Sequence, residues 1–192
     1  MCGSIARDMK VFTSVNNPEI VRILEAGGIG VIRTDTLYGL VGLASDEAAV
    51  ERIFVLKGRD ADKSPIVLIS ETRQLFDEPG LTVTDYLETV WPGPVSVILP
   101  SVKAPIWIRR SNGSVAYRLP DDDGLRLLLQ QVGPLIAPSA NPQGMPPATS
   151  IDEAIHYFSD KVDFYVDGGP VMNAEPSRLV RFDEHGKVTR LR

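Results

Sequence analysis

Two short stretches carry the side chains that could hold an anionic ligand. The first is Thr34-Asp35-Thr36, which follows the apolar run at residues 29–32 and so stands at the end of a predicted strand. The second places Lys57, Arg59 and Lys63 around a glycine, between a predicted helix and another apolar run. Hydroxyl groups at a strand end beside a cationic loop suit an oxygen-rich anion. We expect Lys57 and Arg59 to be exposed in this loop.

A simpler explanation of the three cations is that positive side chains favour the C-terminal end of a helix. That explanation accounts for Lys57 alone. It does not explain why Ser64-Pro65 and an apolar strand follow directly, which anchors the cationic loop to a sheet edge. The pattern therefore favours a role in binding an anion.

A second polar turn, Ser139-Ala140-Asn141, follows an apolar strand and lies between Pro138 and Pro142. Serine and asparagine are common in ordinary turns, so the turn could be a plain loop. Its place at a strand end, between two prolines, instead indicates rigid placement of two polar side chains.

Other common chemistries lack their sequence signals. The phosphate-binding pattern G-x-x-x-x-G-K-[ST] does not occur, and Gly27-Gly28-Ile29-Gly30 does not complete a dinucleotide-binding fingerprint. The single cysteine, Cys2, excludes an intrachain disulfide and a cysteine metal cage. The run of acids at 121–123 is better explained by the positive end of a helix than by a metal. His156 and His185 are predicted at the surface, so we identify no metal ligands among the side chains.

Composition is that of an ordinary soluble globular protein. The 192 residues are 43% apolar and 23% charged, and we expect one domain over residues 1–192. The formal net charge of −5 disfavours constitutive nucleic-acid binding, which needs an excess of lysine and arginine. Neither a bilayer-spanning run nor a signal peptide is evident, so we expect a cytoplasmic protein without membrane contact.

Helix and strand signals alternate along the chain, which predicts an α/β domain with a twisted, mixed sheet flanked by helices. Expected helices run from Pro18, capped by Asn17, to Gly27-Gly28, over 46–56, 84–90 and 125–132, and from a Ser150/Glu153 capping box to Phe158. Expected strands cover residues 29–32, 65–69, 95–99, 115–119, 135–137 and 164–166, with a hairpin over 179–191 that turns at 183–186. A loop is expected around Trp107.

Five motifs, in order and in register over nearly the whole chain, resemble those of the YrdC-like family. They are Thr34-Asp35-Thr36-Leu37-Tyr38-Gly39-Leu40, Lys57-Gly58-Arg59 with Lys63, Trp91-Pro92-Gly93-Pro94, Val115-Ala116-Tyr117-Arg118 and Ser139-Ala140-Asn141. The resemblance implies a single YrdC-like domain with a concave site on a mostly open sheet. It also implies a nucleotidyltransferase, L-threonylcarbamoyladenylate synthase, which forms threonylcarbamoyl-AMP and diphosphate from L-threonine, bicarbonate and ATP for the t6A modification of tRNA.

The resemblance also implies roles for individual residues and partners. The catalytic cations are Lys57, Arg59 and Lys63. Threonine is assigned to Thr34, Thr36, Arg118, Ser139 and Ser177, and the nucleotide to Arg59, Lys63, Ser114, Asn141, Thr149 and Arg192. Mg²⁺ is expected with ATP. Downstream partners are the proteins that transfer the threonylcarbamoyl group to tRNA, and a weak contact with tRNA itself is expected.

Some residues depart from the family pattern. Val67-Leu68-Ile69 stands where some members have a histidine, Gln143-Gly144 replaces Ser-Gly, and Ser177-Arg178 replaces Ser-Thr. These departures concern the choice of substrate, not the fold. The alternative function is an RNA-binding module that grips a tRNA backbone. The acidic net charge and the aromatic content of 7% favour the enzyme, because RNA readers typically add stacking platforms.

Overall fold

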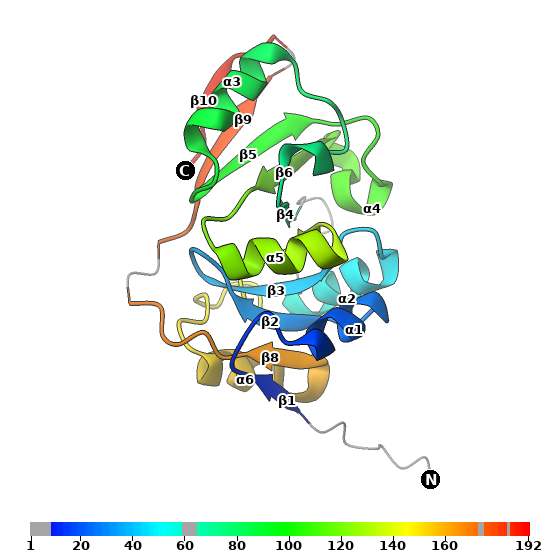
Figure 1. Ribbon diagram of the computed structural model, residues 1–192, viewed down its shortest axis with the longest axis vertical. Coiled ribbons are helices and arrows are strands. Elements are labelled where there is room, and N and C mark those ends of the chain that lie inside the picture. Colours follow the sequence, from blue (N-terminus) through cyan, green and yellow to red (C-terminus); the bar gives the residue numbers. More distant parts are fainter. Residues whose placement is uncertain (1–8, 59–64, 173–174, 184) are drawn as a thin grey trace.

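The computed structural model describes residues 9–58, 65–172, 175–183 and 185–192. The described residues form ten strands in one mixed sheet, in the order β1-β8-β2-β3-β7-β4-β6-β5-β9-β10 (Figure 1). Helices lie against both faces, which confirms the predicted α/β class. Within the described residues, the helices are all too short or too polar to cross a membrane.

The sheet is mixed because neighbouring strands run in both directions. Parallel pairs are β1–β8, β2–β8, β4–β6 and β5–β9, and antiparallel pairs are β2–β3, β3–β7, β4–β7, β5–β6 and β9–β10. The strands are β1 Lys10–Phe12, β2 Gly30–Arg33, β3 Tyr38–Leu43, β4 Ile66–Leu68, β5 Val95–Pro100, β6 Ser114–Arg118, β7 Leu135–Ile136, β8 Phe164–Val166, β9 Arg178–Phe182 and β10 Val188–Arg190.

Polar side chains start several helices where the sequence predicted. Asn17, Asp46 and Ser150 each accept a hydrogen bond from a backbone N–H of the first turn, as N-caps do. The α-helices are α1 Pro18–Glu25, α2 Glu47–Lys57, α3 Leu81–Val90, α4 Ile106–Arg109, α5 Asp123–Val132 and α6 Ile151–Phe158. Short 3-10 turns are η1 Thr72–Gln74, η2 Arg110–Asn112 and η3 Ser159–Lys161.

Apolar side chains form two cores, one on each face of the sheet. The core with α1 and α5 includes Leu24 and Leu128, and the other core receives Ile53 of α2, Ile108 of α4 and Phe158 of α6. α1 and α5 lie side by side on one face in Figure 1. Farther along the same face, residues of β6, β5 and β9 line a cavity, which makes room for a site.

Side-chain alternation along β6 decides which residues face that uncovered area. Val115 and Tyr117 are buried in the core with α2, whereas Ser114, Ala116 and Arg118 line a cavity on the opposite face. This follows from the two-residue period of a strand. The sheet therefore aims one set of polar side chains into the cavity while the other set packs the core.

Three elements were missed in the sequence. β3 was hidden because its apolar residues stand between Gly39 and Gly42, and β1 and α4 span only three and four residues. The predicted loop around Trp107 therefore contains α4. The predicted capping box is only half formed. Ser150 caps Glu153 N–H, but the Glu153 carboxylate accepts from the backbone N–H of Thr149, at 2.7 Å, and from its hydroxyl.

Candidate functional site

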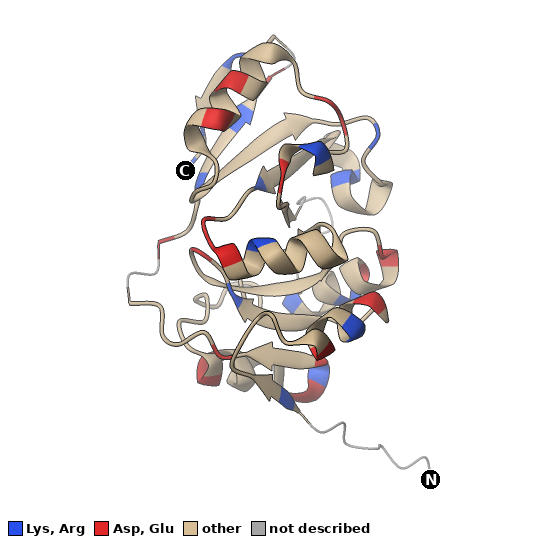
Figure 2. Cartoon of the chain, viewed as in Figure 1, with Lys and Arg blue, Asp and Glu red and all other residues tan. Residues whose placement is uncertain are grey.

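A cavity of about 480 Å³ lies where the turn after β2, the end of β7 and the strands β6 and β9 meet. Its lining includes three arginines, Arg118, Arg181 and Arg192, and no aspartate or glutamate among the described residues. Figure 2 shows basic residues on both β6 and β9, the strands that face the cavity. In a chain with a net charge of −5, this lining provides a local positive field for an anionic ligand.

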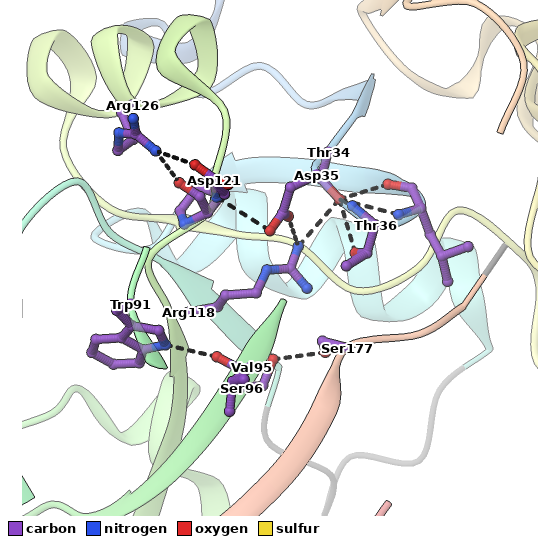
Figure 3. A network of polar contacts seen from close by, with 12 residues as sticks. Thr34, Asp35, Thr36, Trp91, Val95, Ser96, Arg118, Asp121, Arg126 and Ser177 are labelled. Atoms are coloured by element: carbon purple, nitrogen blue, oxygen red, sulfur yellow. Dashed lines mark hydrogen bonds and ion pairs between the residues drawn. The ribbon is translucent and has the colours of Figure 1, made fainter. Parts of the chain in front are cut away.

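Arg118 reaches from the end of β6 toward the turn after β2 (Figure 3). Its Nη2 donates to the hydroxyl of Thr34 at 3.1 Å and forms an ion pair with Asp35 Oδ1, also at 3.1 Å. The side chains of Arg118 and Asp35 are only 4% and 5% exposed. Asp35 Oδ2 accepts from the backbone N–H of Asp121 at 3.3 Å, so the carboxylate links the two walls of the site.

The guanidinium of Arg118 keeps further capacity to bind. Its hydrogen bonds and ion pairs with the described residues all involve Nη2. Arg118 Nε is buried and has no hydrogen-bond partner among them, and Asp35 Oδ1 meets the guanidinium as an ion pair without hydrogen-bond geometry. A buried donor without a partner indicates a place that a ligand can complete.

Burial acts on both members of this pair. It raises the pKa of Asp35 above its ordinary value, and the charge of Arg118 opposes that rise. Burial also lowers the pKa of Arg118, which the carboxylate of Asp35 opposes and the nearby Arg192 reinforces. Each charge is therefore held by the other, because neither is well solvated.

Thr34 organises the turn after β2 and is 4% exposed. Its hydroxyl donates to the carbonyl of Leu37 at 2.7 Å and accepts from the backbone N–H of Thr36 and of Leu37, both at 3.3 Å. Thr34 thus serves mainly as the centre of the turn. Thr36 also lines the cavity and is only partly buried, so its hydroxyl is the more accessible of the two.

The Ser139-Ala140-Asn141 turn receives the ammonium of Lys57, the last residue of α2. Lys57 Nζ donates to the carbonyl of Ser139, to the carbonyl of Asn141 at 2.8 Å and to Asn141 Oδ1 at 3.0 Å. Lys57 is 6% exposed. The expectation that Lys57 is an exposed loop cation is therefore wrong, because the carbonyl groups of this turn draw its ammonium inward.

The C-terminal residues close another wall of the cavity. Ser177 is 3% exposed and shares a hydrogen bond of 2.8 Å with Ser96 of β5. Its carbonyl accepts from Arg192 Nε at 3.2 Å and from Nη2 at 3.1 Å. Arg192 is thereby held across the start of β9, beside the cavity.

The predicted site residues fall into three groups. The cavity is lined by seven of them, which are Thr34, Thr36, Ser114, Arg118, Ser139, Ser177 and Arg192. Lys57, Asn141 and Thr149 are described but are not among its lining residues. Arg59 and Lys63 lie outside the described residues.

Two residues near the cavity were missed in the sequence. Asp35 was noted only as part of a motif, and its partner Arg118 is too distant in sequence to be identified from local spacing. Arg181 could have been found, since it is two residues from Leu179 on β9 and both line the cavity, whereas Val180 between them is buried in the core.

Comparison with known proteins gives concordant matches. The Sua5/YciO/YrdC family model, described as telomere recombination, matches residues 22–192. A threonylcarbamoyl-AMP synthase of Marinobacter nauticus is 35% identical over 161 residues, covering 81% of this chain and 85% of that protein. The synthase of Pseudomonas fluorescens is 33% identical over 176 residues, covering 90% and 95%.

Solved structures agree with this. The crystal structure of P. abyssi Sua5 complexed with L-threonine matches with a TM-score of 0.83 and 31% identity, covering 96% of this chain and 56% of that one. The present chain thus spans just over half the length of that protein.

Proposed function

The chain belongs to the Sua5/YciO/YrdC family, as its five motifs predicted, and we propose that it is a threonylcarbamoyl-AMP synthase. The observation that carries the proposal is the cavity lined by three arginines and no carboxylate. All three proposed substrates carry oxygens that arginine can bind. Threonine and bicarbonate carry carboxylate-type oxygens, and ATP carries phosphates. The relatives named as synthases favour the enzyme over the alternative of an RNA-binding module.

The proposed reaction joins three substrates in two steps. The amine of threonine and bicarbonate form a carbamate with loss of water. A carbamate oxygen then attacks the α-phosphorus of ATP, the bond to the bridging oxygen breaks, and diphosphate leaves with threonylcarbamoyl-AMP as the product. No side-chain nucleophile is required, so the protein acts by positioning the reactants and by neutralising oxygen charge. Binding in the cavity also reduces the exposure of the unstable carbamate to water.

The threonine end of the cavity is assigned to Arg118. A guanidinium binds a carboxylate through two parallel N–H groups, and Asp35 and Thr34 occupy only its Nη2. The hydroxyls of Thr36 and Ser139 stand at the same cavity and supply short polar contacts to the rest of the amino acid, with Ser177 at the opposite wall. Thr34 contributes by shaping the turn.

The nucleotide end is assigned to Ser114 and Arg192, which line the cavity, and to Arg59 and Lys63 for the phosphates. Asn141 and Thr149 contribute through the turn and the start of α6 rather than from the cavity wall. Among the described residues, no group of three or more His, Cys, Asp or Glu side chains could hold a metal. We propose that Mg²⁺ comes with the phosphates of ATP, whose charge it would neutralise.

The product is reactive and must be passed on. The proteins that transfer its threonylcarbamoyl group to tRNA are the proposed partners, and a cytoplasmic location and a weak tRNA contact stay predictions.

Diphosphate release tests the proposal directly. The purified protein should release diphosphate from ATP only when threonine and bicarbonate are both present. Arg118→Met should abolish this release, whereas the matched variant Arg126→Met should retain it, because Arg126 is outside the cavity lining and pairs with Asp121 and Asp123. Equal release without threonine would overturn the assignment.

A further inference from the structure

We infer that Lys57 is a positioning residue, which acts by holding the Ser139-Ala140-Asn141 turn and not by contacting the phosphates of ATP. The inference rests on the proposed function for the identity of the substrates. It concerns how one wall of the cavity is kept in shape before any substrate binds.

Both the side chain and the backbone of Lys57 bind this turn. Its ammonium donates to both carbonyls, of Ser139 and Asn141, and to the side-chain oxygen of Asn141. Its own carbonyl accepts from the backbone N–H of Gln143 at 2.6 Å. The end of α2 is thus bonded to residues 139, 141 and 143, and Lys57 is not among the described residues that line the cavity.

The opposite side of the turn is held by β3. Leu40 N–H donates to the carbonyl of Pro138 at 2.9 Å, and Ala140 N–H donates to the carbonyl of Tyr38 at 2.7 Å. Ser139 forms an isolated bridge with Gly39. The turn therefore lies between β3 and Lys57, and its Ser139 lines the cavity.

The turn favours a cation at this position because three of its acceptor oxygens converge there. Two backbone carbonyls and one amide oxygen point to the same place, and acceptors that are partly shielded from water are costly to leave without donors. An ammonium carries three N–H donors and offers no acceptor, so it matches three oxygens better than a neutral side chain. The hydroxyl of Ser139 also donates to Asn141 Oδ1 at 2.7 Å, so releasing Asn141 frees Ser139 as well.

The two possible roles of Lys57, holding the turn or contacting phosphate, predict different unfolding midpoints for the ligand-free protein. Lys57→Met keeps the length and apolar stem but removes the ammonium. Part-buried acceptors left without a donor lower stability, so the ligand-free protein should unfold at least about 4 °C lower than wild type. A cation that acts only on phosphate would leave the ligand-free midpoint unchanged. The matched control is Lys161→Met, which replaces an exposed lysine at the end of η3 and should unfold within about 1 °C of wild type.

Ligand affinities give the second readout. By calorimetric titration, Lys57→Met should bind threonine at least about fivefold more weakly, because Ser139 is displaced from the cavity wall. ATP affinity should fall less than threonine affinity, because only the indirect support that Asn141 gives to the nucleotide end is lost. A normal ligand-free midpoint together with lost ATP affinity would overturn the inference.

Lys57→Gln keeps the test decisive if Lys57→Met does not fold. Glutamine retains two N–H donors without charge, so it should recover part of both the midpoint and the threonine affinity. A glutamine variant with wild-type stability but no ATP binding would assign Lys57 to the phosphates. If wild-type protein fails to bind threonine, the proposed function is overturned, and the ligand-free midpoints still decide the role of Lys57.

Discussion

Replacing Asp35 by asparagine removes one charge from the ion pair beneath the cavity while keeping the side chain's size. An asparagine that still accepts from the backbone N–H of Asp121 turns its NH₂ group toward Arg118, so the variant loses the charge and places a donor against the guanidinium. Both side chains are at most 5% exposed, so Arg118 is left with a buried charge that neither water nor a carboxylate compensates.

The expected cost is large for a single substitution. Breaking a buried ion pair by removing one partner typically costs about 3–5 kcal/mol. For a chain of this size each kcal/mol lowers the unfolding midpoint by about 2–4 °C, so Asp35→Asn should lose roughly 6–20 °C. Denaturant and thermal unfolding of the ligand-free protein measure both quantities.

A matched control and a double mutant separate the ion pair from general disturbance. Asp163→Asn breaks a pair in which Arg52 is 36% exposed, and solvent should reduce that loss to about 1 kcal/mol. Asp35→Asn combined with Arg118→Met should be more stable than Asp35→Asn alone, because no unpaired charge remains. A loss below about 1 kcal/mol for Asp35→Asn, or strictly additive losses in the double mutant, would refute the reasoning.

Two further predictions concern single side chains. Arg118→Lys keeps the charge but loses the two-pronged contact, so calorimetry should show threonine affinity falling about tenfold or more, with ATP affinity changed much less; equal threonine binding by both proteins would place Arg118 at the nucleotide end. Burial raises the pKa of both Tyr117 and Tyr165 to about 12, so Tyr117→Phe should reduce, without removing, the phenolate absorbance change near pH 12. If the variant instead lost absorbance change near pH 10, the pKa of Tyr117 would not be raised and the prediction would be contradicted.

Local signals in the sequence were sufficient for most elements and insufficient for the contacts between them. Asn17, Asp46 and Ser150 reveal helix starts because a cap acts within its own turn. The ion pair of Asp35 with Arg118 depends on which strands become neighbours, which no spacing along the chain records.

The burial of Lys57 has the same origin as that ion pair. A lysine at a helix end, followed by a glycine, is typical of a solvated C-terminus. Here the carbonyls of a turn more than 80 positions later take its ammonium. The motif therefore identified the right residue for the site, while its contacts became visible only from the arrangement of β3, β7 and α2.

Incorporation of radiolabelled bicarbonate is the most direct measurement of the central claim. With ATP and each amino acid in turn, the wild-type protein should place label in an adenylate product only with threonine, together with one diphosphate for each label incorporated. Arg118→Met should incorporate none, and Arg126→Met should match wild type. Diphosphate release without label in the product, or labelling that does not depend on the amino acid, would contradict the assignment as a threonylcarbamoyl-AMP synthase.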